Sequence, residues 1–103
     1  MDDLTFREFQ KFIREHYYKH DAERGTGGTF LWLMEEVGEL ASSLQKFNDP
    51  GKPASDADRQ NLQEEFADVL GWLSTLANMH DIDLETAVRG KYLESSDLTS
   101  HKP

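Results

Sequence analysis

The sequence predicts an all-α protein, a bundle of about four helices in which two long helices run antiparallel. Apolar residues recur at steps of three and four along most of the chain. Serine, threonine or aspartate stands where helices are expected to begin. No segment of the sequence alternates apolar and polar residues as strands do. We therefore expect one helical domain over residues 1–94 and a frayed tail over 95–103.

The first two expected helices flank a glycine-rich loop. Thr5 and Glu8 have the spacing of a capping box, and the apolar positions after them predict a helix to about Tyr17. Residues 20–28 are polar and rich in glycine, which predicts a loop. A long second helix is expected over 29–47. Its apolar stripe consists of Leu33, Val37, Leu40, Leu44 and Phe47.

Two further helices complete the expected bundle. Prolines and a glycine in 48–57 predict a connecting loop. The second long helix is expected over 58–79, and Asp81 or Asp83 then caps a short helix that ends near Tyr92. The apolar stripe of the second long helix consists of Leu62, Phe66, Val69, Leu73 and Leu76.

Composition narrows the functional classes. Eleven lysines and arginines stand against 20 aspartates and glutamates, for a net charge of −9, which argues against a nucleic-acid-binding surface. The absence of cysteine excludes disulfides, zinc–thiolate sites and thiol nucleophiles. The acidic start and the lack of a long apolar run favour a cytoplasmic protein without membrane contact. Hydrophobic residues make up only 37% of the chain, which favours self-association.

Each long helix carries two carboxylates three residues apart. They are Glu36 and Glu39 on the first long helix, and Glu65 and Asp68 on the second, in matching positions of the two apolar patterns. At about 100° per residue, Glu36 and Glu65 lie at the border of the apolar stripe, with the other acid of each helix one turn further on. The two helices can therefore direct four carboxylates toward one point.

Four like charges beside an apolar stripe repel one another and are costly to desolvate, which favours a bound cation. Oxygen ligands without histidine or cysteine suit Mg²⁺, with Mn²⁺ as a second possibility. A di-iron bundle would require Glu-x-x-His pairs, and the sequence has none. The alternative is a solvated acidic rim, with Lys46 or Arg59 as counter-ions.

The pattern EEVGEL, followed after a loop by EEFADVL, resembles the MazG-type family of all-α nucleoside triphosphate pyrophosphohydrolases. The mark of that family is Glu-Glu-x-x-Glu followed by Glu-x-x-Asp, and the resemblance runs from about Phe30 to Lys91. It implies a homodimer or homotetramer that cleaves a nucleoside triphosphate into monophosphate and pyrophosphate. It also implies that Mg²⁺ is held by the catalytic carboxylates Glu36, Glu39, Glu65 and Asp68.

The resemblance implies further substrate contacts. Lys91 matches a lysine near the phosphates, and Trp72 matches an aromatic position that faces the nucleotide. Lys46 is a third candidate for substrate binding, at the phosphates. The alternatives are a solvated lysine, a core tryptophan and a counter-ion to Glu39. Many members place an asparagine four residues after the lysine and then an arginine, whereas this chain has Ser95 and no arginine, which puts base recognition by this segment in doubt.

The hypothesis from sequence is a Mg²⁺-dependent pyrophosphohydrolase that acts on deoxy or non-standard nucleoside triphosphates. One alternative is a non-catalytic helical module that binds nucleotide and Mg²⁺, or an oligomerising partner protein. Another is a purely structural helical oligomer, which predicts that Mg²⁺ leaves the stability unchanged.

Overall fold

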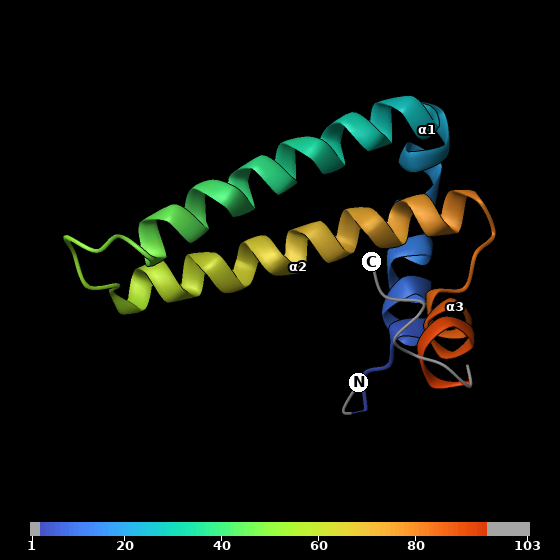
Figure 1. Ribbon diagram of the computed structural model, residues 1–103. Coiled ribbons are helices and arrows are strands. Elements are labelled where there is room, and N and C mark those ends of the chain that lie inside the picture. Colours follow the sequence, from blue (N-terminus) through green and yellow to red (C-terminus); the bar gives the residue numbers. More distant parts are fainter. Residues whose placement is uncertain (1–2, 95–103) are drawn as a thin grey trace.

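The computed structural model describes residues 3–94, which are helical along most of their length (Figure 1). No strand occurs in this part of the chain, so the all-α class is confirmed. The expected frayed tail over 95–103 lies outside the described residues. The elements are α1 (Phe6–Phe47), α2 (Asp56–Met79), α3 (Leu84–Val88) and a π-helical turn, η1 (Arg89–Leu93).

Helix α1 bends at Gly25, and this bend replaces the loop that was expected over 20–28. That expectation is wrong, because helical structure extends through the segment and only Gly25 leaves it, with φ 78° and ψ 170°. Such backbone angles are essentially restricted to glycine. Arg24 donates to Asp21 and to Thr29 and so holds the two sides of the bend together. Two expected helices are thus one bent α1, and the described part of the chain contains three α-helices rather than four.

The part of α1 that follows the bend lies beside α2, and the chain reverses in the loop 48–55 (Figure 1). Helix α2 begins at Asp56, earlier than expected, because Ser55 and Asp58 form a capping box. The Ser55 hydroxyl accepts from the Asp58 amide, and the Asp58 carboxylate accepts from the Ser55 amide. The reversal of the chain before this cap brings the acidic faces of α1 and α2 together.

The part of α1 that precedes the bend lies against the far end of α2 and against α3 (Figure 1). The side chain of Gln10 is buried there: its amide group donates to the carbonyl of Ile82, and its oxygen accepts from the amide of Leu84. Asn78 donates to the backbone carbonyl of Gln10 over 3.1 Å. Asp83 caps α3, which confirms one of the two expected caps. These bonds fix the N-terminal segment where it closes one end of the paired helices.

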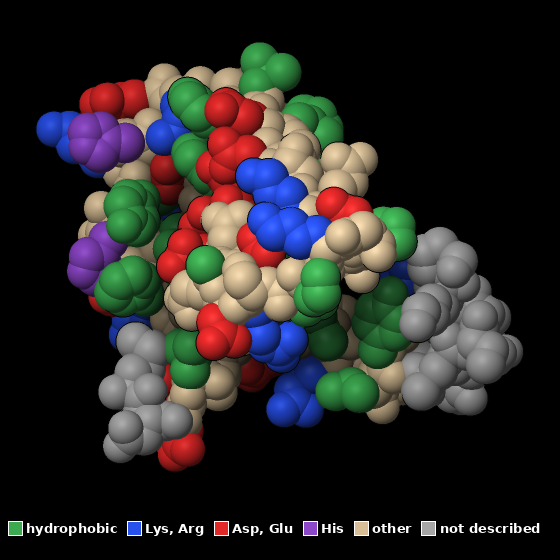
Figure 2. Space-filling view, turned by 90° about the vertical axis from the view of Figure 1, so that its left-hand side faces the viewer, with side chains coloured by type: hydrophobic (Ala, Val, Ile, Leu, Met, Phe, Trp, Pro, Cys, Tyr) green, Lys and Arg blue, Asp and Glu red, His purple; other side chains and the backbone are tan. Residues whose placement is uncertain are grey.

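Hydrophobic side chains are poorly covered in the single chain. Among the described residues, only Ile13, Leu33 and Ala77 are buried hydrophobic residues. Phe66 and Leu73, which belong to the apolar stripe expected to face inward, remain 54% and 44% exposed. Hydrophobic side chains accordingly reach the surface in the space-filling view (Figure 2). Within residues 3–94, no helix is both long and apolar enough to cross a membrane.

Candidate metal centre and adjoining cavities

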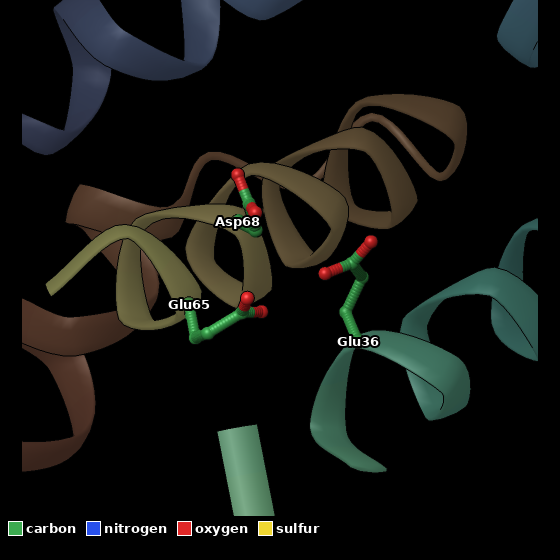
Figure 3. Close-up of side chains that lie close together, drawn as sticks. All are labelled: Glu36, Glu65 and Asp68. Atoms are coloured by element: carbon green, nitrogen blue, oxygen red, sulfur yellow. The ribbon is translucent and has the colours of Figure 1, made fainter. Parts of the chain in front are cut away.

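Three carboxylates from two helices converge on one point. Glu36 comes from α1 and Glu65 and Asp68 come from α2, and one carboxylate oxygen of each lies within 4.8 Å of the others. In Figure 3, Glu36 extends from α1 toward the side of α2 that carries Glu65 and Asp68. We call these three residues the carboxylate cluster. The carboxylate cluster contains residues of both α1 and α2, the two helices that lie side by side in Figure 1.

The helical period explains this arrangement. Glu36 follows the buried Leu33 by one turn, so it lies where the inner face of α1 meets solvent. Glu65 follows the half-buried Leu62 by the same interval on α2. Both glutamates are themselves half-buried, whereas Asp68 is exposed. The cluster therefore lies at the edge of the helix interface, with one side open to a ligand.

Glu39, the fourth predicted acid, is exposed and lies outside the cluster of three. Its charge still acts on two members, because it contributes to the raised pKa values of both Glu36 and Glu65. Glu39 is therefore close enough to belong to the same electrostatic site.

The carboxylates make one another difficult to ionise. The pKa of Glu36 is raised to about 7, first by desolvation on burial and then by the charges of Glu39, Asp68 and Glu65. Burial likewise raises the pKa of Glu65, followed by the charges of Glu39 and Asp68. In the absence of a cation, Glu36 therefore retains a proton up to near-neutral pH.

Two buried oxygen atoms of the cluster lack a hydrogen-bond partner. They are Oε2 of Glu36 and Oε2 of Glu65, each of which is shielded from solvent. Buried carboxylate oxygens without partners are costly, and a divalent cation would satisfy both of them. Within residues 3–94, neither Lys46 nor Arg59 forms a salt bridge, so the counter-ions expected for a solvated acidic rim are not in place. The donor set consists of oxygen atoms alone, which fits Mg²⁺ or Mn²⁺.

A cavity of about 540 Å³ lies on one side of the cluster and is bordered by Asp68. Trp72, one turn after Asp68, lines it as well. The Trp72 ring is stacked with that of Trp32, with 6.1 Å between centroids and 11° between planes. We call this space the aromatic cavity. Its further lining consists of Phe9, Ile13, Tyr17, His20, Asp21, Arg24, Ala67, Gly71 and Thr75.

A second cavity, of about 560 Å³, lies on another side of the cluster and is lined mainly by polar groups. Glu39 and Glu65 border it, and Lys46 lines it on α1. Ser42, Ser43 and Asn61 add hydroxyl and amide groups, and Asn61 donates to the hydroxyl of Ser43 over 3.0 Å. We call this space the polar cavity. On the face of the molecule shown in Figure 2, acidic side chains lie next to lysines and arginines.

The other candidate residues have different places. Lys91 is exposed on η1, where its ammonium group lies 5.7 Å from the ring centre of Tyr92, and it lines neither of the two cavities. The prediction that Lys91 meets phosphate thus has no support from the cavities of the described chain. Glu64 is exposed and accepts a hydrogen bond from Gln60 on the outer side of α2.

Sequence reasoning missed Asp21 and Arg24, because it assigned them to a loop. Both line the aromatic cavity, and the guanidinium of Arg24 lies 4.9 Å from the ring centre of Trp72. A signal was available: Ile13, Tyr17 and Asp21 follow one another at steps of four, which places the acid on the apolar face if the helix continues.

Comparison with known proteins identifies a family and a relative. The model of the family described as the MazG nucleotide pyrophosphohydrolase domain matches residues 26–92, which contain all four carboxylates. A protein of Bacillus subtilis strain 168, named uncharacterized protein YvdC, is 31% identical over 93 residues. The alignment covers 84% of this chain and 88% of that protein.

Proposed function

Because the chain belongs to the MazG nucleotide pyrophosphohydrolase family, we propose that it hydrolyses nucleoside triphosphates to the monophosphate and pyrophosphate. The proposed substrates are deoxy or non-standard nucleoside triphosphates, and the reaction depends on Mg²⁺. The observation that carries the proposal is the carboxylate cluster, in which Glu36 and Glu65 each retain a buried oxygen without a partner. The complete set of acids favours an enzyme over a non-catalytic binding module.

In this proposal Glu36, Glu65 and Asp68 hold the cation, and Glu39 completes the set from the adjoining turn of α1. Bound Mg²⁺, or Mn²⁺ in its place, supplies neutralisation of phosphate charge and activation of water. One of the four carboxylates accepts the proton of the attacking water. The helix pair holds these groups on rigid elements, so little reorganisation is needed when the substrate binds.

The two cavities favour one orientation of the proposed substrate. The aromatic cavity, with Trp72, offers apolar walls to a base and opens beside Asp68. The polar cavity, with Lys46, offers a cation and neutral donors to the terminal phosphates. The triphosphate would then cross the cluster between them, which brings the bond between its first and second phosphates near the cation. Lys91 remains a proposed phosphate contact, on the strength of the family pattern alone.

We further propose that the chain works as a homodimer or homotetramer. Exposed side chains of the apolar stripe of α2, such as Phe66 and Leu73, are the surface that a second copy would cover. An assembly would also explain how a chain with so few buried hydrophobic residues is stable. Its proposed location is the cytoplasm, where nucleoside triphosphates and Mg²⁺ are abundant.

Product analysis tests the proposal. The purified protein is incubated with ribo- and deoxyribonucleoside triphosphates and Mg²⁺, without added pyrophosphatase, and the products are separated by anion exchange. We expect monophosphate and pyrophosphate in equal amounts from one or a few of the substrates. The Glu36→Gln protein, prepared in parallel, controls for contaminating phosphatases.

Two outcomes would contradict the proposal. Diphosphate and orthophosphate would mean that a different bond is cut. No turnover on any substrate, with Mg²⁺ still raising the melting temperature, would instead identify a non-catalytic module that binds Mg²⁺ and nucleotide.

A further inference from the structure

The carboxylate of Asp21 is almost completely buried, yet it lines the aromatic cavity. Asp21 is 4% exposed and lies on the part of α1 that precedes the bend, outside the stretch matched by the family. Asp68 of the carboxylate cluster borders the same cavity. A buried ionised group requires hydrogen-bond partners or a ligand to offset its desolvation. The position of this group, beside the carboxylate cluster but not part of it, suggests a role in recognising the substrate.

Arg24 donates to only one of the two carboxylate oxygens of Asp21. Its Nη1 atom donates to Oδ1 of Asp21 over 3.1 Å and to the hydroxyl of Thr29 over 3.2 Å. Among the described residues, no side chain donates to Oδ2 of Asp21. A guanidinium group carries five N–H donors, so Arg24 also retains donors that these bonds do not use. One wall of the cavity therefore offers an acceptor and a donor close together.

A purely structural explanation is that the two side chains only clamp the bend at Gly25. The bond from Arg24 to Thr29 spans the bend and serves that purpose. The carboxylate of Asp21 does not span it, since Asp21 and Arg24 lie on the same side. Thr29 is fully buried and does not line the cavity, so it belongs to the clamp alone. Substitution of Thr29 therefore tests the clamp, and substitution of Asp21 tests the cavity wall.

We propose that Asp21 and Arg24 select bases that carry an exocyclic amino group next to a ring-nitrogen acceptor, as cytosine and adenine do. Oδ2 of Asp21 accepts from the amino group, and a free N–H of Arg24 donates to the ring nitrogen. Uracil and hypoxanthine place a carbonyl oxygen where the amino group would be, and the carboxylate repels it. This inference rests on the proposed function, because it assigns the aromatic cavity to the base of the substrate.

Matched pairs of substrates test the inference. The ratios of kcat/KM for dCTP over dUTP, and for dATP over dITP, are measured on the wild-type protein and on Asp21→Asn. The wild type is expected to favour the amino-bearing member by about tenfold or more. The amide of Asp21→Asn can donate to a carbonyl oxygen, so the ratios should fall to about one or below. A ratio does not depend on the fraction of folded enzyme.

Thr29→Val is the matched control, because it removes the bond from Arg24 that spans the bend and leaves Asp21 and its bond from Arg24 in place. It should lower the melting temperature and keep both ratios at the wild-type values. Unchanged ratios in Asp21→Asn, or ratios that fall equally in Thr29→Val, would overturn the inference.

A binding measurement separates failure of the inference from failure of the proposed function. Calorimetric titration with dCMP and dUMP reports base selection without turnover. If the wild type hydrolyses no triphosphate, the proposed function fails. Preference for dCMP in the wild type, lost in Asp21→Asn, would still support selection at Asp21, whereas equal binding of the two would overturn it.

Discussion

Glu36 and Glu65 belong to different helices, yet each places one carboxylate oxygen in a buried position without a hydrogen-bond partner. Like charges in such positions repel one another and are poorly solvated, so the folded chain is least stable when both groups are ionised. A proton or a cation can relieve that cost. The cluster should therefore link stability, pH and metal binding, and each link can be measured separately.

The stability of the metal-free protein should fall as the pH rises toward and through 7. Glu36 has a folded-state pKa of about 7 against an ordinary value of 4.5, so the folded chain retains a proton that the unfolded chain has lost. Stability from this group is fully present below about pH 4.5 and is lost as the pH rises through 7. Glu36→Gln should flatten this decline and raise the melting temperature at pH 8. Thermal unfolding of both proteins in a chelating buffer, at a series of pH values, measures the decline in melting temperature.

The control for that experiment is Glu64→Gln, which removes an exposed acid on the outer side of α2. It should keep the wild-type dependence on pH. The same decline in Glu36→Gln as in the wild type would show that the proton is held elsewhere.

Mg²⁺ should stabilise the folded chain through the same cluster. At a concentration about 100 times the dissociation constant, binding to the folded state alone should raise the melting temperature by roughly 10–20 °C. The increase should be larger at pH 8 than at pH 6, because protons compete for Glu36. Asp68→Asn should lose most of it and Glu64→Gln none. Equal increases in all three proteins would mean that the ion binds elsewhere.

Removal of a cluster carboxylate should abolish turnover without unfolding the protein. We expect Glu36→Gln and Asp68→Asn to lower kcat by roughly 10³-fold, since the charge stabilisation supplied by a catalytic cation is worth several kcal/mol. Far-ultraviolet circular dichroism should show unchanged helicity. Glu64→Gln should be nearly silent, as its side chain faces away. Activity retained in both cluster variants would refute the assignment of the site.

Of Gly25 and Gly27, the bend in α1 should require only the first to be glycine. Gly25→Ala forces an alanine into φ 78° and ψ 170°, which should cost about 1–3 kcal/mol. Gly27→Ala lies next to the bend in helical backbone with open space around it, so it should stabilise by about 0.5–1 kcal/mol. Urea denaturation compares the two free energies of unfolding. Equal effects would indicate that the bend tolerates side chains.

The exposed part of the apolar stripe of α2 should hold the proposed assembly together. A charge in place of Phe66, which is 54% exposed in the single chain, should dissociate the proposed oligomer, so that Phe66→Glu elutes as a monomer in size-exclusion chromatography with light scattering. The neighbouring exposed Gln63 gives the control, Gln63→Glu, which should keep the wild-type mass. A monomeric wild type would contradict the proposal at once.

Local signals in the sequence predicted the ends of helices well, and failed where distant contacts decide the structure. Thr5 and Asp83 cap their helices as expected, because a cap depends on neighbouring residues alone. The segment around Gly25 has weak helix propensity, and its helical structure depends on the bonds of Arg24 and on its packing beside Trp72. The two bonds of Arg24 are local, but they require side-chain positions that periodicity does not reveal, and the contact with Trp72 joins residues far apart in sequence.

The candidate site was predicted in part for the same reason. Helical spacing placed Glu36, Glu65 and Asp68 on facing sides of two helices, and the structure brings them together. Spacing also indicated that Glu39 lies one turn on and further round, but it gave Asp68 the matching position and so did not indicate that only Asp68 joins the cluster. Asp21 reaches the site only through the bend, so no spacing within the acidic motif could indicate it.

The bend at Gly25 also separates two parts of the chain to which we assign different proposed roles. The residues after it, from 26 onward, contain the four carboxylates and the whole family match. The segment before it supplies the wall of the aromatic cavity that carries Asp21. In our two proposals, the residues after the bend carry out the reaction, and Asp21 and Arg24 before the bend select the base. A chimera that takes residues 6–24 from a relative with another nucleotide preference should keep the reaction and inherit the preference of the donor.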